Sequence, residues 1–181
     1  MVKRLQKKER LTARLISVLI FLVMFNMLSI PLYIALYTNF SFEPLKELNA
    51  GIVSVTLRFL GYDARADGSV INLVSGEAMN KIDISWDSTG WKSMYAVAAL
   101  IIATPISEFS RRMKFALGGA VAIFFINYIR IATTIFVSAK FGFTLFDIVH
   151  TVLWREGLIL AVVAIWFAWM RMEKYKIWKT K

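Results

Sequence analysis

The chain divides into four long apolar stretches joined by more polar segments. The first, Leu15 to Tyr37, runs for 23 residues without a charge. A helix rising about 1.5 Å per residue needs about 20 residues to cross roughly 30 Å of hydrocarbon. Three further stretches follow at 91–109, 115–139 and about 151–170. The pattern predicts an all-α polytopic membrane protein with about four transmembrane helices, forming a single integral membrane domain over residues 1–181.

Charged residues predict how these helices cross the membrane. Lys and Arg gather before the first stretch, between the second and third, and after the fourth, whereas most acidic residues lie in the segment 38–90. Basic loops stay on the cytoplasmic side. We therefore expect a multi-pass protein of the plasma membrane with both termini in the cytoplasm and residues 38–90 outside.

The segment 38–90 has a pattern of its own. "NAGIVSVTLRFLGYDA" predicts a helix that ends at Gly61 and packs on the spans or lies in the membrane interface. Beyond it, apolar residues from Val70 to Val74 and at Ile82 and Ile84 predict two short strands. Asp-Gly and Ser-Gly pairs beside them are typical of turns. A small extracytoplasmic helix and β-hairpin cap is thus expected to lead the chain into Ser88. The apolar residues assigned to the helix are Ile52, Val55, Leu57, Phe59 and Leu60.

Composition narrows the function classes. Hydrophobic residues make up 58% of the chain, the mean hydropathy is +0.60 and the net charge is +10. Because the positive charges adjoin apolar runs, lipid headgroups explain them better than nucleic acid, which we do not expect as a partner. The chain has no cysteine, which excludes disulfides, thiolate metal sites and a cysteine nucleophile in this sequence. We expect no metal and no cofactor.

Three polar residues fall at one level of the predicted membrane. Arg130 lies about 22 Å from the inner edge of its stretch, on one helical face with Asn127 and Thr134. The only histidine, His150, begins the fourth stretch at its outer end, and Ser88 begins the second. A buried arginine is costly and indicates function. The sequence therefore brings Ser88, Arg130 and His150 to the outer leaflet together.

Each of these residues also has a structural explanation. Ser88 is a suitable N-cap for the helix that starts near Gly90. Arg130 could extend outward to lipid phosphates, His150 could serve structure alone, and Arg155 could pair with Glu156 at the interface. The shared depth of the three residues favours a common functional role, since no structural need ties them together.

The residues from about Asn49 to Ile165 resemble the exosortase/archaeosortase family of membrane transpeptidases, and the archaeosortase branch in particular. The likeness lies in the "AGIVSVTLRFLGYDARADGSVINL" approach, "DSTGW", "NYIRIATT" and "FDIVHTVLW". The family has a catalytic Cys just before a small residue and Gly, an Arg in an N-x-x-R run, and a later His or Arg. The resemblance places Ser88, Arg130 and His150 at these catalytic positions. It implies supporting roles for Thr89, Gly90, Asn127, Thr134 and Arg155.

This sequence departs from the family at the nucleophile, where Ser88 replaces Cys. A thiol ionises near pH 8.5 and lower beside cations, whereas serine needs a base during attack. Two explanations compete: a laboratory Cys-to-Ser form that holds substrate without turnover, or a natural serine variant. We favour the first, because the rest of the pattern is intact.

The resemblance implies a reaction and partners. A precursor protein with a C-terminal sorting signal (a short motif, a transmembrane helix and a basic tail) would be cleaved at position 88 through a thioester in the Cys form. Arg130 would stabilise the oxyanion, or hold the nucleophile as an anion, and His150 would protonate the leaving amine and activate the acceptor. The acceptor would be an amine or hydroxyl of a lipid or glycan, so membrane lipids are both environment and possible acceptor.

Two other functions fit parts of the sequence. An intramembrane serine protease could use Ser88 and His150, although no G-x-S-x-G elbow is present. A small transport or assembly subunit would need neither Arg130 nor His150 for chemistry.

Overall fold

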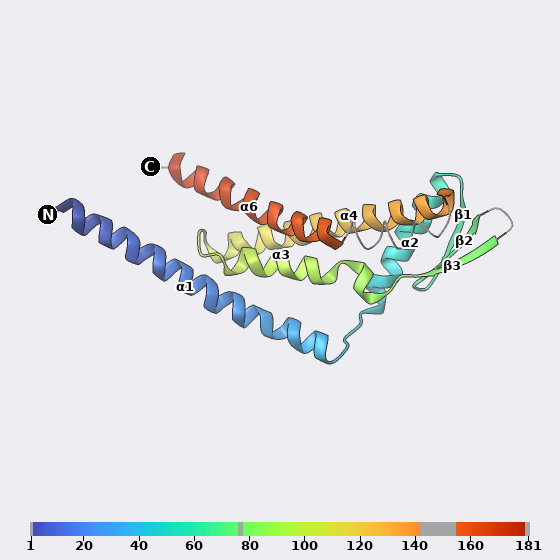
Figure 1. The fold of residues 1–181 in the computed structure, drawn as a ribbon, viewed down its shortest axis with the longest axis horizontal. Coiled ribbons are helices and arrows are strands. Elements are labelled where there is room, and N and C mark those ends of the chain that lie inside the picture. The colour runs from blue at the N-terminus through green and yellow to red at the C-terminus, as the bar shows by residue number, and fades with distance from the viewer. Residues whose placement is uncertain (1, 76–77, 142–154, 180–181) are drawn as a thin grey trace.

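The computed structural model describes residues 2–75, 78–141 and 155–179. The long helices run along one axis of the molecule, and a small sheet lies at one end (Figure 1). The elements are α1 (Val2–Tyr37), α2 (Glu43–Phe59), β1 (Asp63–Asp67), β2 (Val70–Ser75), β3 (Ala78–Asp83), the 3₁₀ turn η1 (Trp86–Thr89), α3 (Trp91–Ala103), α4 (Phe109–Phe141) and α6 (Arg155–Lys179).

Helices α3, α4 and α6 pack into a bundle whose buried residues we call the bundle core. Gly119 of α4 lets the helices approach, because a Cβ there would lie 3.2 Å from Ile101 on α3. At one end of the bundle, Arg111 on α4 pairs with the buried Glu173 of α6 at 2.8 Å. The bundle core consists of Val97, Ile101, Ala116, Ile123, Leu158, Val162 and Trp169.

The helix lengths revise the predicted spans. Residues Leu11–Tyr37 of α1 and all of α4 are long and apolar enough to cross a membrane. The prediction of a helix through Phe109 was wrong: α3 has 13 residues and ends at Ala103, just before Thr104 and Pro105. Proline disfavours a helical residue before it, which explains the stop. The predicted start of the fourth span at Thr151 lies outside the described residues, and α6 is described from Arg155.

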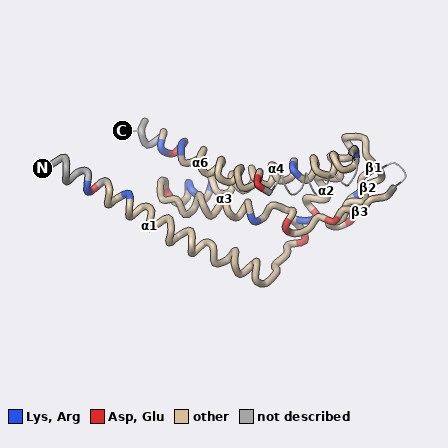
Figure 2. Tube along the Cα trace, viewed as in Figure 1, with Lys and Arg blue, Asp and Glu red and all other residues tan. Residues whose placement is uncertain are grey.

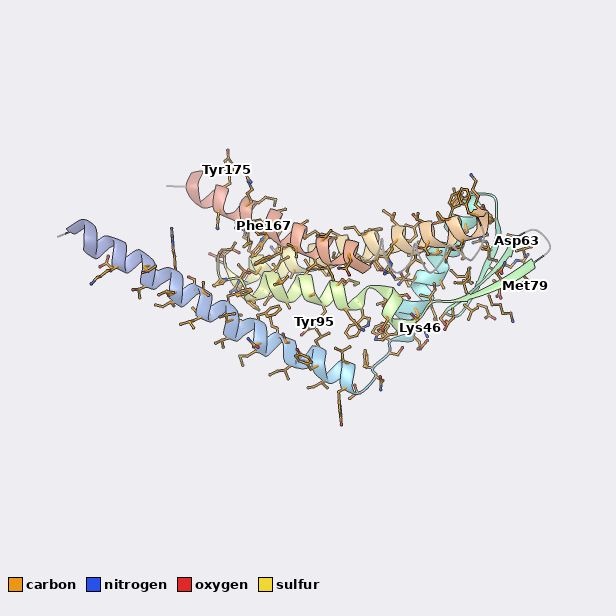
Figure 3. The ribbon with its side chains drawn as sticks, in the orientation of Figure 1. Lys46, Asp63, Met79, Tyr95, Phe167 and Tyr175 are labelled. Atoms are coloured by element: carbon orange, nitrogen blue, oxygen red, sulfur yellow. The ribbon has the colours of Figure 1, made fainter. Side chains whose placement is uncertain are left out.

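Helix α1 packs along α3 and leaves its other sides open. Tyr95 of α3 donates its hydroxyl to the main-chain carbonyl of Leu28, and Figure 3 shows Tyr95 between the two helices. Phe21 stacks on Trp166 of α6 with ring centroids 6.1 Å apart. Most other α1 side chains are exposed, as expected for a helix that lipid surrounds.

The end opposite the chain termini carries a three-stranded antiparallel sheet in the order β1-β2-β3. The two predicted strands pair as expected, with Ile71 opposite Ile82. The prediction of a hairpin was incomplete, because the charged segment "DARAD" forms a third strand beside β2. Its charged residues are exposed and only Ala64 is buried, so hydrophobic alternation gave no signal there.

The helix predicted before Gly61 is α2, and only some of its apolar residues are buried. The helix ends at Phe59, and Gly61 follows with φ of 89°, in agreement with the expected stop. Leu57 is fully buried, but Phe59 is 88% exposed. The buried side of α2 consists of Asn49, Ala50, Val53, Ser54 and Leu57.

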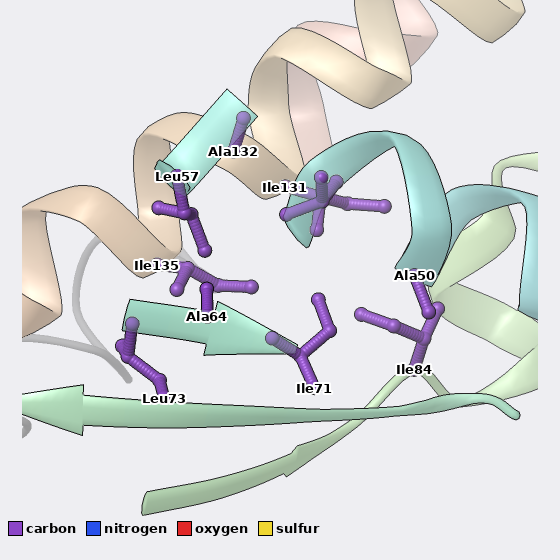
Figure 4. Packing of buried hydrophobic residues seen from close by; sticks show 10 residues of the cluster. Ala50, Leu57, Ala64, Ile71, Leu73, Ile84, Ile131, Ala132 and Ile135 are labelled. Atoms are coloured by element: carbon purple, nitrogen blue, oxygen red, sulfur yellow. The ribbon is translucent and has the colours of Figure 1, made fainter. Parts of the chain in front are cut away.

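Helix α2 and one face of the sheet enclose the last turns of α4, in a cluster that we call the cap core (Figure 4). Ile131, Ala132 and Ile135 of α4 meet Ile71 and Leu73 of β2 there. Because α4 belongs to both cores, one continuous helix ties the bundle to the sheet. The remaining members of the cap core are Ala50, Val53, Leu57, Ala64 and Ile84.

Both termini lie at the same end of the molecule, away from the sheet (Figure 1). Lys and Arg gather toward that end of α1 and α6, whereas Asp and Glu are most frequent around the sheet and η1 (Figure 2). This polarity agrees with the arrangement expected from the sequence, in which both termini share one side of the membrane.

The cap core supplies a test of the α2 face. Leu57→Ala removes a fully buried side chain and should lower the free energy of unfolding by about 2–5 kcal/mol. Phe59→Ala, two residues away on the exposed side, should change it by less than about 0.5 kcal/mol. Unfolding midpoints of the two purified variants compare them directly. An equal loss for both would contradict the observed face.

Candidate functional site

The site begins with the turn that joins the sheet to α3. Ser85 caps η1, and its side chain accepts a hydrogen bond from the main-chain N–H of Ser88. Gly90, with φ of 77°, then turns the chain into α3. Gly90 and not Ser88 is therefore the N-cap of α3, and the capping explanation for Ser88 was wrong. The Ser88 hydroxyl instead forms a hydrogen bond with the Ser85 hydroxyl at 2.8 Å.

Two side chains of α4 hold this turn by its main chain. Asn127 donates its amide N–H to the carbonyl oxygen of Ser88 at 2.9 Å, and Arg130 donates from Nη2 to the same oxygen at 3.1 Å. Both side chains are buried, and Thr134 one turn further is buried as well. The predicted shared face of α4 thus meets the predicted Ser88 turn.

Gly90 is the point of closest approach between the turn and α4. A Cβ on Gly90 would lie 2.7 Å from Cγ of Asn127, nearer than such atoms come in folded proteins. The left-handed φ adds a second reason for glycine at this position. Thr89, fully buried beside it, donates its hydroxyl to the carbonyl of Trp86.

A small pocket of about 40 Å³ lies between the turn, β3 and α4. A space of this size holds one or a few water molecules. Ser88, Arg130 and Thr134 supply its polar lining, while four isoleucines and Asp83 complete the wall. The isoleucines are Ile82, Ile84, Ile131 and Ile135.

Arg130 is buried without an ion pair to any described residue; Asp83 lines the same pocket, but its carboxylate accepts a hydrogen bond from the Ser69 hydroxyl. Arg130 is 7% exposed, takes part in none of the ion pairs found in residues 2–75, 78–141 and 155–179, and its Nε has no hydrogen-bond partner there. This side chain does not reach outward to the membrane surface, so the lipid-phosphate explanation is wrong. A cation held in a site of low polarity acts strongly on any negative charge formed beside it.

Aromatic rings surround the turn on its outer side. Trp86 and Trp91 stack with centroids 5.2 Å apart, and the edge of Phe40 meets Trp86. Lys92 pairs with Asp87 at 2.8 Å, at the surface beside this stack. The ring stack bridges the two ends of the Ser88 turn and fixes its shape.

Two predicted site residues cannot be placed. His150 lies outside the described residues. Arg155 is the first described residue of α6, but its side chain is not described. Within the part of the chain that the structure describes, no three His, Asp or Glu side chains gather as metal ligands would.

Sequence reasoning missed two parts of the site. Ser85, the partner of the Ser88 hydroxyl, sits three residues earlier, a spacing typical of a capping serine that could have been noticed. The isoleucine walls come from β3 and the end of α4, and only tertiary packing brings them together.

Comparison with known proteins identifies a family. The sequence model of the transmembrane exosortase family covers residues 10–170. No curated protein and no solved structure matches the chain.

The contact between Gly90 and Asn127 can be tested by adding one methyl group. Gly90→Ala places a Cβ against Asn127 at a positive φ and should destabilise the protein by more than about 1 kcal/mol. Gly118→Ala in α4 is the matched control, since nothing lies within 4 Å of its Cβ position. It should leave the unfolding midpoint unchanged or raise it slightly, because alanine favours helix. Equal effects of the two substitutions would refute the close approach.

Proposed function

The chain belongs to the transmembrane exosortase family, and on that premise we propose that it is a membrane-embedded transpeptidase of the cysteine type with its reacting group at position 88. The observation that carries the proposal is the pair of hydrogen bonds from Asn127 and Arg130 to the Ser88 carbonyl. They join the proposed nucleophile position to the buried cation that the reaction needs. No such link is required for a helix that merely crosses a membrane.

Arg130 would act on the charge that develops during acyl transfer. Removing a cation from water is costly unless an anion compensates it, and no carboxylate does so among the described residues. A thiolate at position 88, or the oxyanion formed when it attacks a carbonyl, would supply that compensation. The free Nε leaves Arg130 with a donor available for this purpose.

Asn127, Thr89 and Gly90 would position the nucleophile. Asn127 fixes the carbonyl of residue 88, and Gly90 allows the main chain to lie against Asn127. The hydroxyl of Thr89 ties the turn to Trp86. A side chain at position 88 is thereby held on a rigid turn at the edge of the pocket, as effective catalysis requires.

The substrate we propose is a secreted precursor whose C-terminal sorting signal combines a short motif, a transmembrane helix and a basic tail. The nucleophile would attack outside the membrane, giving an acyl enzyme that a lipid or other acceptor then resolves. His150 would protonate the leaving amine, with Thr134 and Arg155 in support. Both termini would lie in the cytoplasm, and the chain would cross the plasma membrane more than once, with α1 and α4 long enough to span it.

Serine at position 88 makes this chain a slow or inactive form. Its hydroxyl forms a hydrogen bond with the Ser85 hydroxyl, its one side-chain hydrogen bond within residues 2–75, 78–141 and 155–179. A serine must lose its proton during attack and is a poorer nucleophile than a thiolate, whereas a thiol beside Arg130 would ionise readily.

Ser88→Cys tests the nucleophile directly. A tagged precursor from the same genome, ending in a hydrophobic helix and a basic tail, should be cleaved by the Cys form at least about a hundredfold faster than by the Ser form. The acyl enzyme should be released by hydroxylamine, as a thioester is. Ser85→Cys places a thiol three residues away and should remain inactive. If Ser88→Cys cleaves the precursor no faster than the Ser form, the proposal is contradicted.

The role of Arg130 can be measured without any substrate. Because the chain has no cysteine, Ser88→Cys contains a single thiol whose rate of alkylation by iodoacetamide can be followed against pH. Arg130 should hold the pKa of this thiol below its usual value near 8.5, so the reactive thiolate persists to lower pH. Adding Arg130→Gln should raise the midpoint of the alkylation profile, by about one pH unit or more. Arg58→Gln, on the exposed part of α2, should leave it unchanged; equal midpoints in all variants would remove Arg130 from the site.

A further inference from the structure

We propose that the free edge of β3 binds the recognition motif of the precursor as an added strand, which guides the scissile carbonyl to position 88. This inference rests on the proposed function and deepens it. It assigns the motif a conformation, a direction and a binding surface.

The hydrogen bonds of the sheet identify which main-chain groups lie on this edge. Ile84 donates its main-chain N–H to Ser69, so Ile84 faces β2. In an antiparallel pair, successive residues face the partner and face away in turn. The register therefore turns the N–H and C=O of Met79, Lys81 and Asp83 away from β2. In the described part of the chain, no hydrogen bond uses these outward main-chain groups.

Nothing described covers this edge. Helix α2 packs against β1 and β2, whereas β2 is the only described element with which β3 makes more than incidental contact. Met79 is 62% exposed, and β3 lies at the margin of the cap in Figures 1 and 3. A row of unpaired main-chain groups is a template for an incoming strand.

The edge leads directly to the pocket. Ile82, Asp83 and Ile84, at the end of β3, line the same pocket as Ser88 and Arg130. The chain then enters η1, so a strand that follows β3 arrives beside position 88. The pocket of about 40 Å³ is too small for a peptide segment, so the motif would bind outside it, and the open edge of β3 adjoins it.

The direction of the added strand follows from the topology. β3 runs from the outer tip of the cap toward the bundle, and the precursor must run the same way to place its C-terminal helix in the bilayer. The motif therefore pairs in parallel with β3. A segment of six residues would match the length of β3.

A second copy of the chain fits this edge less well. Lys81 lies in the middle of the outward row and is exposed, so two β3 strands paired with Lys81 opposite Lys81 would bring like charges together. Lysine on an edge strand is a common device against self-association. The occupant we infer is the extended motif of the precursor.

Lys81→Pro in the Ser88→Cys form tests the added strand. Proline removes one outward N–H and leaves the ladder to β2 intact, as is tolerated on edge strands. The value of kcat/KM for the precursor should fall by about fivefold to tenfold, the effect of one main-chain hydrogen bond. Lys81→Ala keeps the N–H and should change it by less than about twofold. The alkylation rate of the thiol at position 88 reports whether the site is intact in both variants.

A second measurement does not depend on folding of the proline variant. Short synthetic peptides of the motif, N-methylated at one residue at a time, compete with the precursor for the Ser88→Cys form without further substitution. An added strand predicts that inhibition is lost at every second residue. Uniform effects along the peptide, or an unchanged kcat/KM for an intact Lys81→Pro variant, would overturn the proposal.

Failure of the two proposals can be told apart. Absence of cleavage by Ser88→Cys contradicts the transpeptidase function. Strand addition can still be measured on the unsubstituted protein, by hydrogen exchange. The motif peptide should protect the main-chain amides of Met79, Lys81 and Asp83 from exchange. If the Ser88→Cys form cleaves normally but the peptide does not protect these amides, the added strand is overturned and the transpeptidase function stands. If the amides are protected without peptide, and more so at higher protein concentration, the occupant of the edge is a second copy of the chain.

Discussion

The rest of the site depends on two hydrogen bonds from α4 to one main-chain carbonyl oxygen. Asn127 and Arg130 both donate to the main-chain oxygen of Ser88, and they do so from consecutive turns of one helix. Because both bonds are made to the main chain, they do not involve the side chain at position 88. They also explain why the neighbouring positions are so constrained: the turn must lie flat against α4, which only a residue without a Cβ at position 90 permits.

This contact lies where two cores meet. Residues before Arg130 on α4 contribute Ala116 and Ile123 to the bundle core, whereas Ile131 and Ile135 after it belong to the cap core. A site between two packed regions is covered by both of them, yet it lies at the edge of each hydrophobic core. Such a boundary can hold a charged side chain away from bulk water without placing it in the middle of a hydrophobic core, where the cost would be greatest.

Hydrophobic patterning and a few polar residues predicted much of this arrangement. The long apolar runs indicated α1 and α4, and the i, i+3, i+7 spacing of Asn127, Arg130 and Thr134 correctly indicated a shared buried face. That this face would meet Ser88 followed from equal depth in the membrane, and the two hydrogen bonds to the Ser88 carbonyl agree with it. The catalytic roles of these residues stay predictions, as does that of His150.

Other features could not be read from the chain because they depend on tertiary packing. β1 has one buried residue, so its charged sequence gives no strand periodicity, and pairing with β2 alone defines it. The buried face of α2 includes Asn49 and Ser54, whose side chains bond the carbonyls of Leu45 and Gly51 in their own helix. Because such polar side chains donate within their own helix, they can lie on a buried face that a count of apolar positions does not detect.

The continuity of α4 has a consequence for the response to different bilayers. A helix of 33 residues extends about 50 Å, well beyond a hydrocarbon layer of roughly 30 Å. A thinner or thicker bilayer would change the tilt of this rod. Because the cap is packed on the same rod as Asn127 and Arg130, it tilts with them, and the distances around Ser88 stay constant. The site around Ser88 would therefore keep one geometry in membranes of different thickness, while its depth in the membrane would vary.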